Sequence, residues 1–479
     1  MMDPFSSITE IASALRRRQV SSVELTRMYL HRLRTLGAAH RAVAELTEER
    51  ALEQSKAADS QRPKGPLHGI PFGVKDLLAT KGIPTRWGSP GHMDQVFDYD
   101  ATAVARLQQA GGVLVAKLAM IELAGGGNYN IAAASHTGAC LCAWDPTRWS
   151  GGSSSGSGAA TALGCVAYSL GSETSGSITC PSAFNGVTGF RPTYGRVSRH
   201  GAMALCWSLD KIGPMGRSVE DCALVLETIA GPDPNDPSTL TEPLNLRRPG
   251  PKPKIGLLRE SFAENGAEAC EKAYGEALRV FRSLGYETVD VAYPTMPYGL
   301  AVGIIVDAEG ASAHERFIRS KKLNMLADPH QVAGFAAALE TRASDYLWAM
   351  RLRTQALAAN AVWEKCDAIF TPVFYHCAPP ANVPFDQSFA KMGGDRGPAN
   401  LLGWPSAAFP IGFETGCPLG GQIIAPAFRE DVCYRVVSDF QRATDWHRRL
   451  PEPVSFSPQT RDRPIEAIGD RRRDWLPIA

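Results

Sequence analysis

The sequence predicts an α/β fold, a large and mostly parallel mixed sheet that is covered by helices on both faces. Short runs rich in branched apolar residues, such as 113–117, alternate with helical segments, such as 100–111, as in proteins whose strands are joined through helices. The alternation continues over all 479 residues without an internal repeat. We therefore expect one domain, 1–479, with 44% apolar and 21% charged residues as in ordinary globular proteins.

The N-terminal segment 1–62 is predicted to be helical and to pack on the main domain or form oligomer contacts. Ser7 and Ser21 each precede a glutamate by three residues, which is the capping-box pattern that begins a helix. A longer helix is expected at roughly 44–58, and the Pro/Gly-rich stretch 62–66 ends the segment.

The rest of the chain alternates between predicted strands and helices. Strands are expected at 67–77, 113–117, 186–190, 212–215, 254–258, 286–291 and 367–372. Helices are expected at 100–111, 218–230, 266–284 and 433–448, with mostly helical sequence from 292 to 365. A proline-rich seam introduces the βαβ unit that begins at 254, and we expect 232–395 to be a more variable, insert-like region of the same domain.

The composition argues against several classes of partner. A net charge of +1 offers no field that would attract nucleic acid or an anionic membrane. The 11 cysteines are odd in number and scattered, which indicates reduced, buried thiols, and the 10 histidines form no zinc-binding pattern, so neither a metal nor a cofactor is expected. Because there is no export signal and no run of about 18 apolar residues, we expect a cytoplasmic protein.

Two runs of small residues, 151–158 and 171–177, flank the apolar segment 159–170. A flexible Gly/Ser linker is the ordinary meaning of such runs, but the apolar segment between them indicates burial. The glycines lack the lysine of a phosphate-binding loop and the third small residue of the dinucleotide pattern. Residues 152–156 match the nucleophile elbow Gly-x-Ser-x-Gly, but the preceding 142–149 reads as a loop and not as a buried strand.

Lys75 places an ammonium group among apolar neighbours in the predicted strand 67–77. One interpretation is a lysine at the end of a strand that reaches solvent or pairs with Asp76. The other is a lysine in a dry site, where desolvation would lower its pKa and allow it to act as a neutral base.

Together with these two runs, the segment around Lys75 makes the chain resemble the amidase signature family of serine hydrolases. The family's Gly-x-Pro-x-x-x-Lys-Asp is matched at 69–76, and its Gly-Gly-Ser-Ser-Gly-Gly-Ser is matched at 151–157 with one change. Its Gly-Ser-Asp-Thr-Gly-Gly-Ser-Ile-Arg is matched at 171–179 with three changes. The likeness continues through 189–193, 208–214 and 400–405, so the ordered motifs cover nearly the whole chain.

The resemblance implies a Ser–cis-Ser–Lys triad. Ser177 is the nucleophile, Ser153 follows a cis peptide bond and relays the proton, and Lys75 is the neutral base. The two serines are 24 positions apart (177 − 153), as in the family. Ser154 is expected to hydrogen-bond Lys75 and orient it. The oxyanion hole is expected from four backbone N–H groups, those of Thr174, Ser175, Gly176 and Ser177.

The acyl site of the family is bordered by a loop whose match here is Gly125, Gly126, Gly127 and Asn128. Trp207 is either a wall of the substrate pocket or a core residue. Three residues depart from the family pattern, and they put the substrate range in doubt: Glu173 replaces aspartate, Ser175 replaces glycine and Thr179 replaces arginine. Without that arginine, an ion pair near the nucleophile cannot form in its common way.

The leading hypothesis is a stand-alone amidase that cleaves the C–N bond of a small or aryl amide through a Ser177 acyl-enzyme, with side activity on carbamates (urethanes) and esters. Such an enzyme would act on a small molecule, and a homodimer is compatible with it. An alternative is the glutamine-hydrolysing subunit of a tRNA-dependent amidotransferase, which would need a partner and a charged clamp, for instance Asp395 and Arg396. A catalytically inactive scaffold is a further alternative, against which the intact triad argues.

Overall fold

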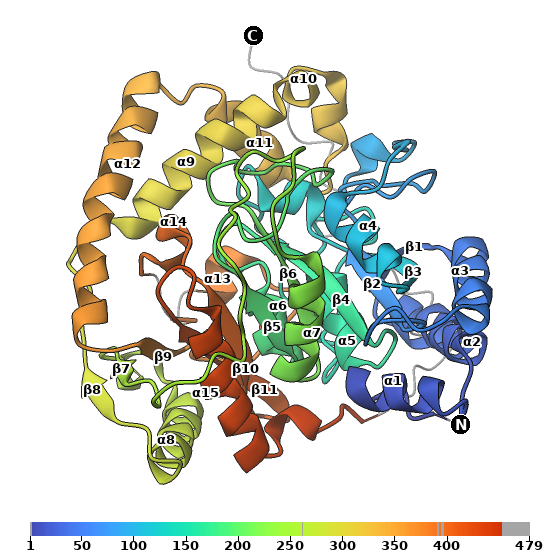
Figure 1. The fold of residues 1–479 in the computed structure, drawn as a ribbon. Coiled ribbons are helices and arrows are strands. Elements are labelled where there is room, and N and C mark those ends of the chain that lie inside the picture. Colours follow the sequence, from blue (N-terminus) through green and yellow to red (C-terminus); the bar gives the residue numbers. More distant parts are fainter. Residues whose placement is uncertain (1, 261, 390–391, 394–396, 453–479) are drawn as a thin grey trace.

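The computed structural model describes residues 2–260, 262–389, 392–393 and 397–452, and one mixed sheet lies at its centre (Figure 1). The described part of the chain contributes eleven strands to this sheet. Across the sheet their order is β1 (Val43–Leu46), β3 (Val113–Leu118), β2 (Pro71–Lys75), β4 (Tyr168–Glu173), β6 (Lys211–Gly216), β5 (Thr188–Arg191), β10 (Ser406–Glu414), β11 (Cys417–Ile424), β9 (Ala368–Pro372), β7 (Ile255–Leu257) and β8 (Thr288–Asp290).

The predicted mixed sheet is confirmed, but it is less parallel than expected. Of the ten ladders between the described strands, four are parallel, namely β3–β2, β2–β4, β9–β7 and β7–β8. The ladder β1–β3 and all five ladders from β4 to β9 are antiparallel. The prediction assumed that helices connect the strands throughout the sheet, as they do in parallel sheets. In the middle of the sheet, a hairpin connects two neighbouring strands instead.

That hairpin joins β10 and β11 through a two-residue turn, Thr415 and Gly416, whose φ angles of 49° and 82° are both left-handed. Such a turn matches the twist of two antiparallel strands. The hairpin was not predicted, because its sequence contains Pro410, Pro418 and several glycines, and such residues interrupt most strands. Both strands are almost wholly buried, so they show no alternation of apolar and polar residues.

The N-terminal segment contains two of the predicted helices and one unpredicted strand. α1 (Ile8–Arg16) and α2 (Ser22–Arg32) begin at the expected capping boxes. The helix predicted at 44–58 is wrong at its start: β1 occupies Val43–Leu46, and α3 (Glu48–Ser60) follows. The open edge of β3 accepts β1 as an antiparallel neighbour, and this tertiary pairing overrides the local helical preference.

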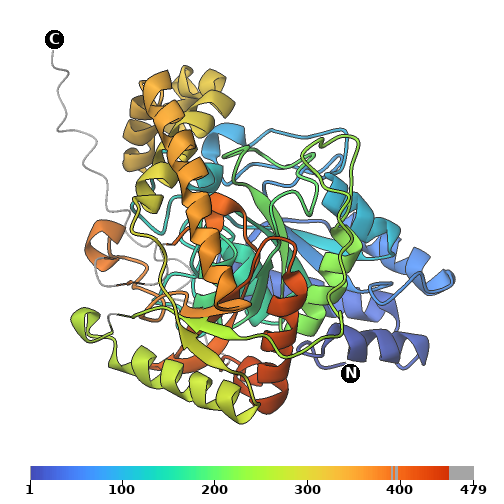
Figure 2. The same cartoon turned by 60° about the vertical axis from the view of Figure 1, so that its left-hand side comes forward.

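Helices cover both faces of the sheet, as predicted. α4 (Thr102–Gln109), α7 (Val219–Ile229), α15 (Glu430–Ala443) and α8 (Glu268–Ser283) follow one another over one face, and α5 (Ser155–Ala162) and α6 (Thr179–Asn185) lie on the other. A group of helices stands at one end of the molecule (Figures 1 and 2): α9 (Tyr298–Ala313), α10 (Glu315–Ile318), α11 (Pro329–Ala338) and α12 (Ala343–Ala356). The short helices α13 (Phe385–Ser388) and α14 (Ala399–Leu402) complete the set.

Most predicted elements of the second half are confirmed within a few residues. The βαβ unit is β7, α8 and β8, and mostly helical sequence follows it. The last predicted helix, 433–448, instead begins at Glu430 and ends at Ala443. The region 232–395 contributes β7, β8 and β9 to the common sheet, which agrees with one domain, although the proposed boundaries stay a prediction.

Three further observations concern the composition of the folded chain. All 11 cysteines are buried, and none forms a disulfide. Among the described residues no group of three or more acidic, histidine or cysteine side chains could hold a metal ion. None of the described helices is both long and apolar enough to cross a membrane.

The close approach of α5 to the sheet gives a prediction for stability. A Cβ atom on Gly156 in α5 would lie 2.3 Å from the Ala42 carbonyl oxygen and 2.4 Å from the Ala119 nitrogen, both of which are backbone atoms. We expect Gly156→Ala to lower the free energy of unfolding by at least ~1–3 kcal/mol, because the backbone must move.

The matched control is Gly275→Ala in the middle of α8, where an added Cβ meets nothing within 4 Å. This variant should be more stable than the wild type by roughly 0.5–1 kcal/mol, since alanine restricts the unfolded chain. Urea denaturation of both variants measures the difference. A Gly156→Ala protein as stable as the wild type would contradict the packing described here.

Candidate active site

The candidate site lies where the carboxyl ends of β2 and β4 meet. These two strands are parallel neighbours, so Lys75 at the end of β2 lies beside Ser172 near the end of β4. The loop that precedes α5 brings Ser153 to the same place. Three segments that are far apart in the sequence therefore meet at one edge of the sheet.

Lys75 is fully buried, and its amine contacts two hydroxyl groups. Nζ lies 2.7 Å from Ser153 Oγ and 2.9 Å from Ser172 Oγ, and it donates a longer hydrogen bond of 3.4 Å to the Ser172 carbonyl oxygen. Burial lowers the pKa of Lys75 to about 7, although the negative charges of Asp210 and Glu173 oppose this effect. Of the two interpretations of Lys75, the structure agrees with the lysine in a dry site.

The neighbouring Asp76 does not pair with Lys75. Its carboxylate lies 3.4 Å from Nζ of Lys117, another buried lysine, and accepts a hydrogen bond from the Arg86 backbone nitrogen. The salt bridge that would have kept Lys75 charged is therefore made by a different lysine.

Among the described residues Ser154 makes no hydrogen bond to Lys75, so the predicted hydrogen bond is wrong, whereas a supporting role through Ser172 stays a prediction. Its hydroxyl donates to the Ser172 carbonyl oxygen at 3.1 Å and accepts from the Ser172 nitrogen at 3.2 Å. Ser172 is the residue that contacts the amine, and it was not among the predicted site residues. Its place in the motif 171–179, on a strand parallel to that of Lys75, was the signal that could have identified it.

Ser177 follows β4 in a tight turn and is 9% exposed. The Ser154 nitrogen donates to the Ser177 carbonyl oxygen at 3.3 Å, and the Gly152–Ser153 peptide bond is cis. Within the described residues no hydrogen bond joins the hydroxyls of Ser153 and Ser177. Catalytic contacts of this kind often tighten only when substrate is bound. The structure therefore brings Lys75 and Ser153 into contact and places the Ser177 backbone against Ser154, the neighbour of Ser153.

The turn from Thr174 to Ser177 presents backbone N–H groups without internal acceptors. Gly176 has a left-handed φ of 91°, and its carbonyl oxygen accepts from the Cys180 nitrogen at 2.8 Å. No described residue accepts from the amides of Ser175, Gly176 or Ser177. Ser175 does not have a left-handed φ, so serine replaces the family's glycine there without backbone strain. The oxyanion hole stays a prediction, but the donors that it needs are free.

A buried ion pair next to the turn replaces the one that Thr179 cannot form. Glu173 lies 2.6 Å from Nη1 of Arg191 on β5, and it accepts from the backbone nitrogens of Ile178 and Thr179 at 2.8 and 3.0 Å. Burial alone would raise the pKa of Glu173, but Arg191, Lys211 and the hydrogen bond from the Thr179 backbone together outweigh it, and the pKa is lowered to about 2. Arg191 also donates twice to the Trp404 carbonyl oxygen. The arginine therefore comes from another strand.

A cavity of about 200 Å³ adjoins these residues. Its polar lining includes Ser172 and Thr174, and Trp207 forms part of its wall. Trp207 is 47% exposed, so it is not a core residue. The apolar part of the wall comes mainly from Leu77, Ala124, Met203, Leu205 and Ile212.

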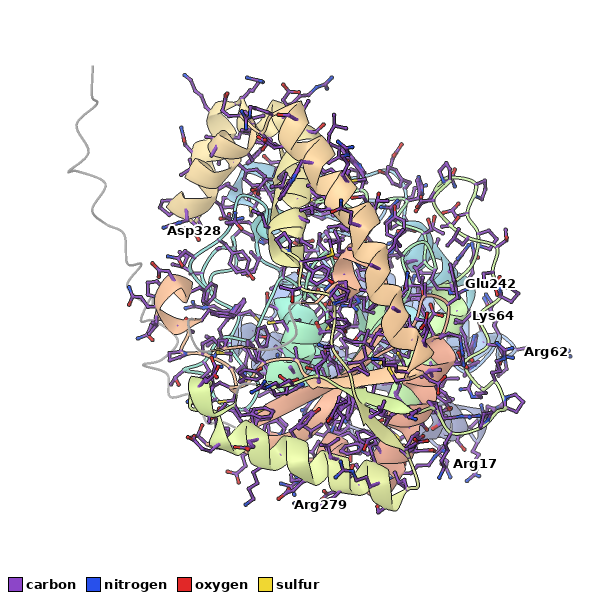
Figure 3. All side chains as sticks on the ribbon, turned by 90° about the vertical axis from the view of Figure 1, so that its left-hand side faces the viewer. Arg17, Arg62, Lys64, Glu242, Arg279 and Asp328 are labelled. Atoms are coloured by element: carbon purple, nitrogen blue, oxygen red, sulfur yellow. The ribbon has the colours of Figure 1, made fainter. Side chains whose placement is uncertain are left out.

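The glycine loop, in contrast, packs against α11 and does not line this cavity. Added Cβ atoms on Gly126 and Gly127 would both meet Phe335, and the Gln331 amide donates to the Gly126 carbonyl oxygen at 2.7 Å. Asp328, labelled in Figure 3 at the start of α11, accepts from the nitrogens of Asn130 and Ile131 just beyond the loop. Helix α11 thus fixes the loop, and a substrate-binding role for Gly125, Gly126, Gly127 and Asn128 stays a prediction. The two residues suggested for a charged clamp, Asp395 and Arg396, lie outside the described residues.

Over most of its length, the chain matches the sequence model of a protein family and the sequences of named proteins. The sequence model of the family described as Amidase matches residues 24–434. The A-subunit of glutamyl-tRNA(Gln) amidotransferase from Roseiflexus sp. (strain RS-1) is 35% identical, with 93% of this chain and 98% of that protein covered.

Solved structures of similar proteins share the fold of this chain. The native peptide amidase from Stenotrophomonas maltophilia has 28% identity and a TM-score of 0.78, with 92% of this chain and 97% of that chain covered. A structure from a vestigial protein complex, described as revealing the origins of an s-triazine catabolic enzyme, has 30% identity and a TM-score of 0.82, with 91% and 98% covered. The predicted fold class is confirmed.

The buried pair of Glu173 and Arg191 gives the second prediction. We expect Arg191→Met to lower the free energy of unfolding by roughly 3–5 kcal/mol, because it leaves a carboxylate buried without its partner. Thermal or urea unfolding measures the change. The control is Arg279→Met on α8, an arginine labelled in Figure 3 whose side chain is 71% exposed, for which a change within about 0.5 kcal/mol is expected. Equal losses in both variants would contradict the role of the pair.

Proposed function

The chain belongs to the amidase family, and from that premise we propose that it hydrolyses the C–N bond of a small, neutral or aryl amide through an acyl-enzyme on Ser177. Membership of this family makes the chain an enzyme that acts on carbon–nitrogen bonds. The observation that carries the proposal is the buried amine of Lys75, which lies 2.7 Å from the hydroxyl of Ser153.

In the proposed first step, the hydroxyl of Ser177 attacks the amide carbonyl carbon. Its proton passes to Ser153 while the proton of Ser153 passes to the neutral amine of Lys75. The carbonyl oxygen becomes negative as the tetrahedral intermediate forms, and the free amides of the 174–177 turn stabilise it.

The intermediate collapses when the proton returns from Lys75 through Ser153 to the departing nitrogen. An amide anion is a very poor leaving group, so this protonation allows the amine to leave. Water then attacks the ester on Ser177 by the same proton path, and the acid is released. Carbamates and esters can acylate Ser177 in the same way, which supports the proposed side activities.

The cavity supports a substrate without strong charge. Arg199 donates to the Trp207 carbonyl oxygen and to Ser238, and it lies 3.5 Å from Asp236. Lys211 donates to backbone carbonyl groups, and Asp210 accepts from Thr174 and from two backbone nitrogens. Each of these charges already has an internal partner, whereas much of the remaining wall is apolar. A neutral acyl or amine group with apolar or aromatic surface fits such a wall.

A second candidate is a glutamine-hydrolysing subunit, which the names of the relatives favour over the first. The relative from Roseiflexus sp. is named as part of an amidotransferase and aligns over nearly its whole length. That function needs a site for the charged ends of glutamine and a partner protein. The cavity lining argues for the first candidate and the relatives for the second. The inactive scaffold is disfavoured by the contact between Lys75 and Ser153, and a homodimer stays a prediction.

Substrate assays separate the two candidates. We expect the purified chain to hydrolyse an aryl amide such as a nitroanilide at least tenfold more efficiently than it releases ammonia from L-glutamine, because no free charge lines the described cavity. Ser177→Ala should abolish both reactions. Efficient glutamine hydrolysis without aryl-amide turnover would favour the second candidate, and full activity of Ser177→Ala would exclude the proposed nucleophile.

The pKa of Lys75 predicts the pH dependence. The amine must be neutral to accept a proton, and it is neutral only above its pKa of about 7. Plotted against pH, kcat/KM should therefore rise between about pH 6 and 8 and then level off. Lys75→Ala should lose several orders of magnitude at every pH. A flat or acid-favoured profile in the wild type would contradict a lysine base.

A further inference from the structure

Two consecutive charged residues at the start of β6 lie against the candidate oxyanion turn. β4 and β6 are antiparallel, and Glu173 at the end of β4 is paired with Lys211 at the start of β6. This register places Asp210 and Lys211 beside Thr174, the first residue of the turn. Neither takes part in the proton path proposed above.

Asp210 and Lys211 hold Thr174 at two different groups. The Thr174 hydroxyl donates to Asp210 Oδ1 at 2.6 Å. The Lys211 amine donates to the Thr174 carbonyl oxygen at 3.5 Å and to the carbonyl oxygen of Leu209. In a trans peptide the C=O of one residue and the N–H of the next point in opposite directions. A fixed Thr174 carbonyl group therefore directs the Ser175 N–H away from Lys211.

The other oxygen of Asp210 reaches the wall of the cavity. Oδ2 accepts from the backbone nitrogens of Leu205 and Cys206, each at 2.9 Å. These residues precede Trp207, and Leu205 and Trp207 both line the cavity. One carboxylate thus joins the turn that would bind the oxyanion to the wall that would contact the substrate.

We propose that Asp210 and Lys211 are positioning residues that hold the 174–177 turn in its catalytic shape and couple it to the cavity wall. The inference rests on the proposed function, because the turn matters only if Ser177 forms an acyl-enzyme. It also gives a structural role to Asp210 and Lys211, two charged residues that face the cavity but are already hydrogen-bonded to protein groups. A substrate that displaces the cavity wall then also displaces the turn, because Asp210 is hydrogen-bonded to both.

Three variants each alter one of the hydrogen-bonding groups: Thr174→Val, Asp210→Asn and Lys211→Met. We expect kcat to fall on the order of 10- to 100-fold in each, since small displacements of oxyanion donors have effects of this size. KM should change by less than about threefold, because the lost interaction forms mainly in the transition state. Thr174→Ser, which keeps the hydroxyl, should recover part of the loss. Lys272→Met, at an exposed lysine on α8, is the matched control and should leave kcat unchanged.

The pH profile distinguishes positioning from a general loss of structure. The carboxylates of Asp210 and Glu173 face Lys75 and raise its pKa against the effect of burial. Arg191 pairs with Glu173, and burial lowers the pKa of Lys211, which lies next to both carboxylates, to about 7 as well. Asp210→Asn removes one of the two negative charges, so its rising limb should move to lower pH. Thr174→Val keeps every charge and should leave the limb in place while kcat falls.

Labelling of Ser177 with a fluorophosphonate separates the two ways in which the inference could fail. If the wild-type protein neither reacts with the probe nor turns over an amide, the proposed function is wrong and the inference falls with it. If the wild type reacts and turns over but Thr174→Val and Asp210→Asn match it in kcat, the inference alone is wrong. Should Asp210→Asn fail to fold, the nearly isosteric Thr174→Val decides.

Discussion

The proposed mechanism depends on one constraint, an amine that must become uncharged in contact with a hydroxyl group. Burial of Lys75 between two parallel strands removes the water that would stabilise its ammonium form, and its pKa falls to about 7. Ser153 and Ser172 then provide hydrogen-bonding partners that carry no charge. A neighbouring carboxylate in direct contact would restore the positive charge and remove the base.

The surrounding charges are arranged in agreement with this constraint. Glu173 is only one residue away from Ser172, but Arg191 pairs with it at 2.6 Å, so much of its negative charge is compensated before it acts on Lys75. Asp76, the neighbour of Lys75 in the sequence, pairs with Lys117. Asp210 is occupied by Thr174 and two backbone nitrogens. The two carboxylates that act on the amine, Asp210 and Glu173, are thus each held by another partner, and so is Asp76.

The sequence was sufficient for the parts of the fold that have local patterns. Capping boxes marked α1 and α2, and the family motifs marked the segments of Lys75, Ser153 and Ser177. The hairpin of β10 and β11 was missed because strands buried on both faces need no alternation and here contain proline and glycine. The contact between Lys75 and Ser172 was missed, and Ser154 was expected in its place, because this contact depends on which strand lies beside β2, and the pairing of β2 with β4 is not a local property.

Different segments of the chain form the proposed catalytic groups and much of the cavity wall. This separation explains how the fold can accommodate different amides. The amine, the hydroxyls and the oxyanion turn all come from 71–177, on β2, β4 and the loops between and after them. Much of the cavity wall comes from elsewhere: residues of 199–207 line the cavity together with Leu77 and Ala124, and α11 from the 232–395 region fixes the loop after β3. Changes in these outer segments can alter the shape and charge of the cavity without moving Lys75.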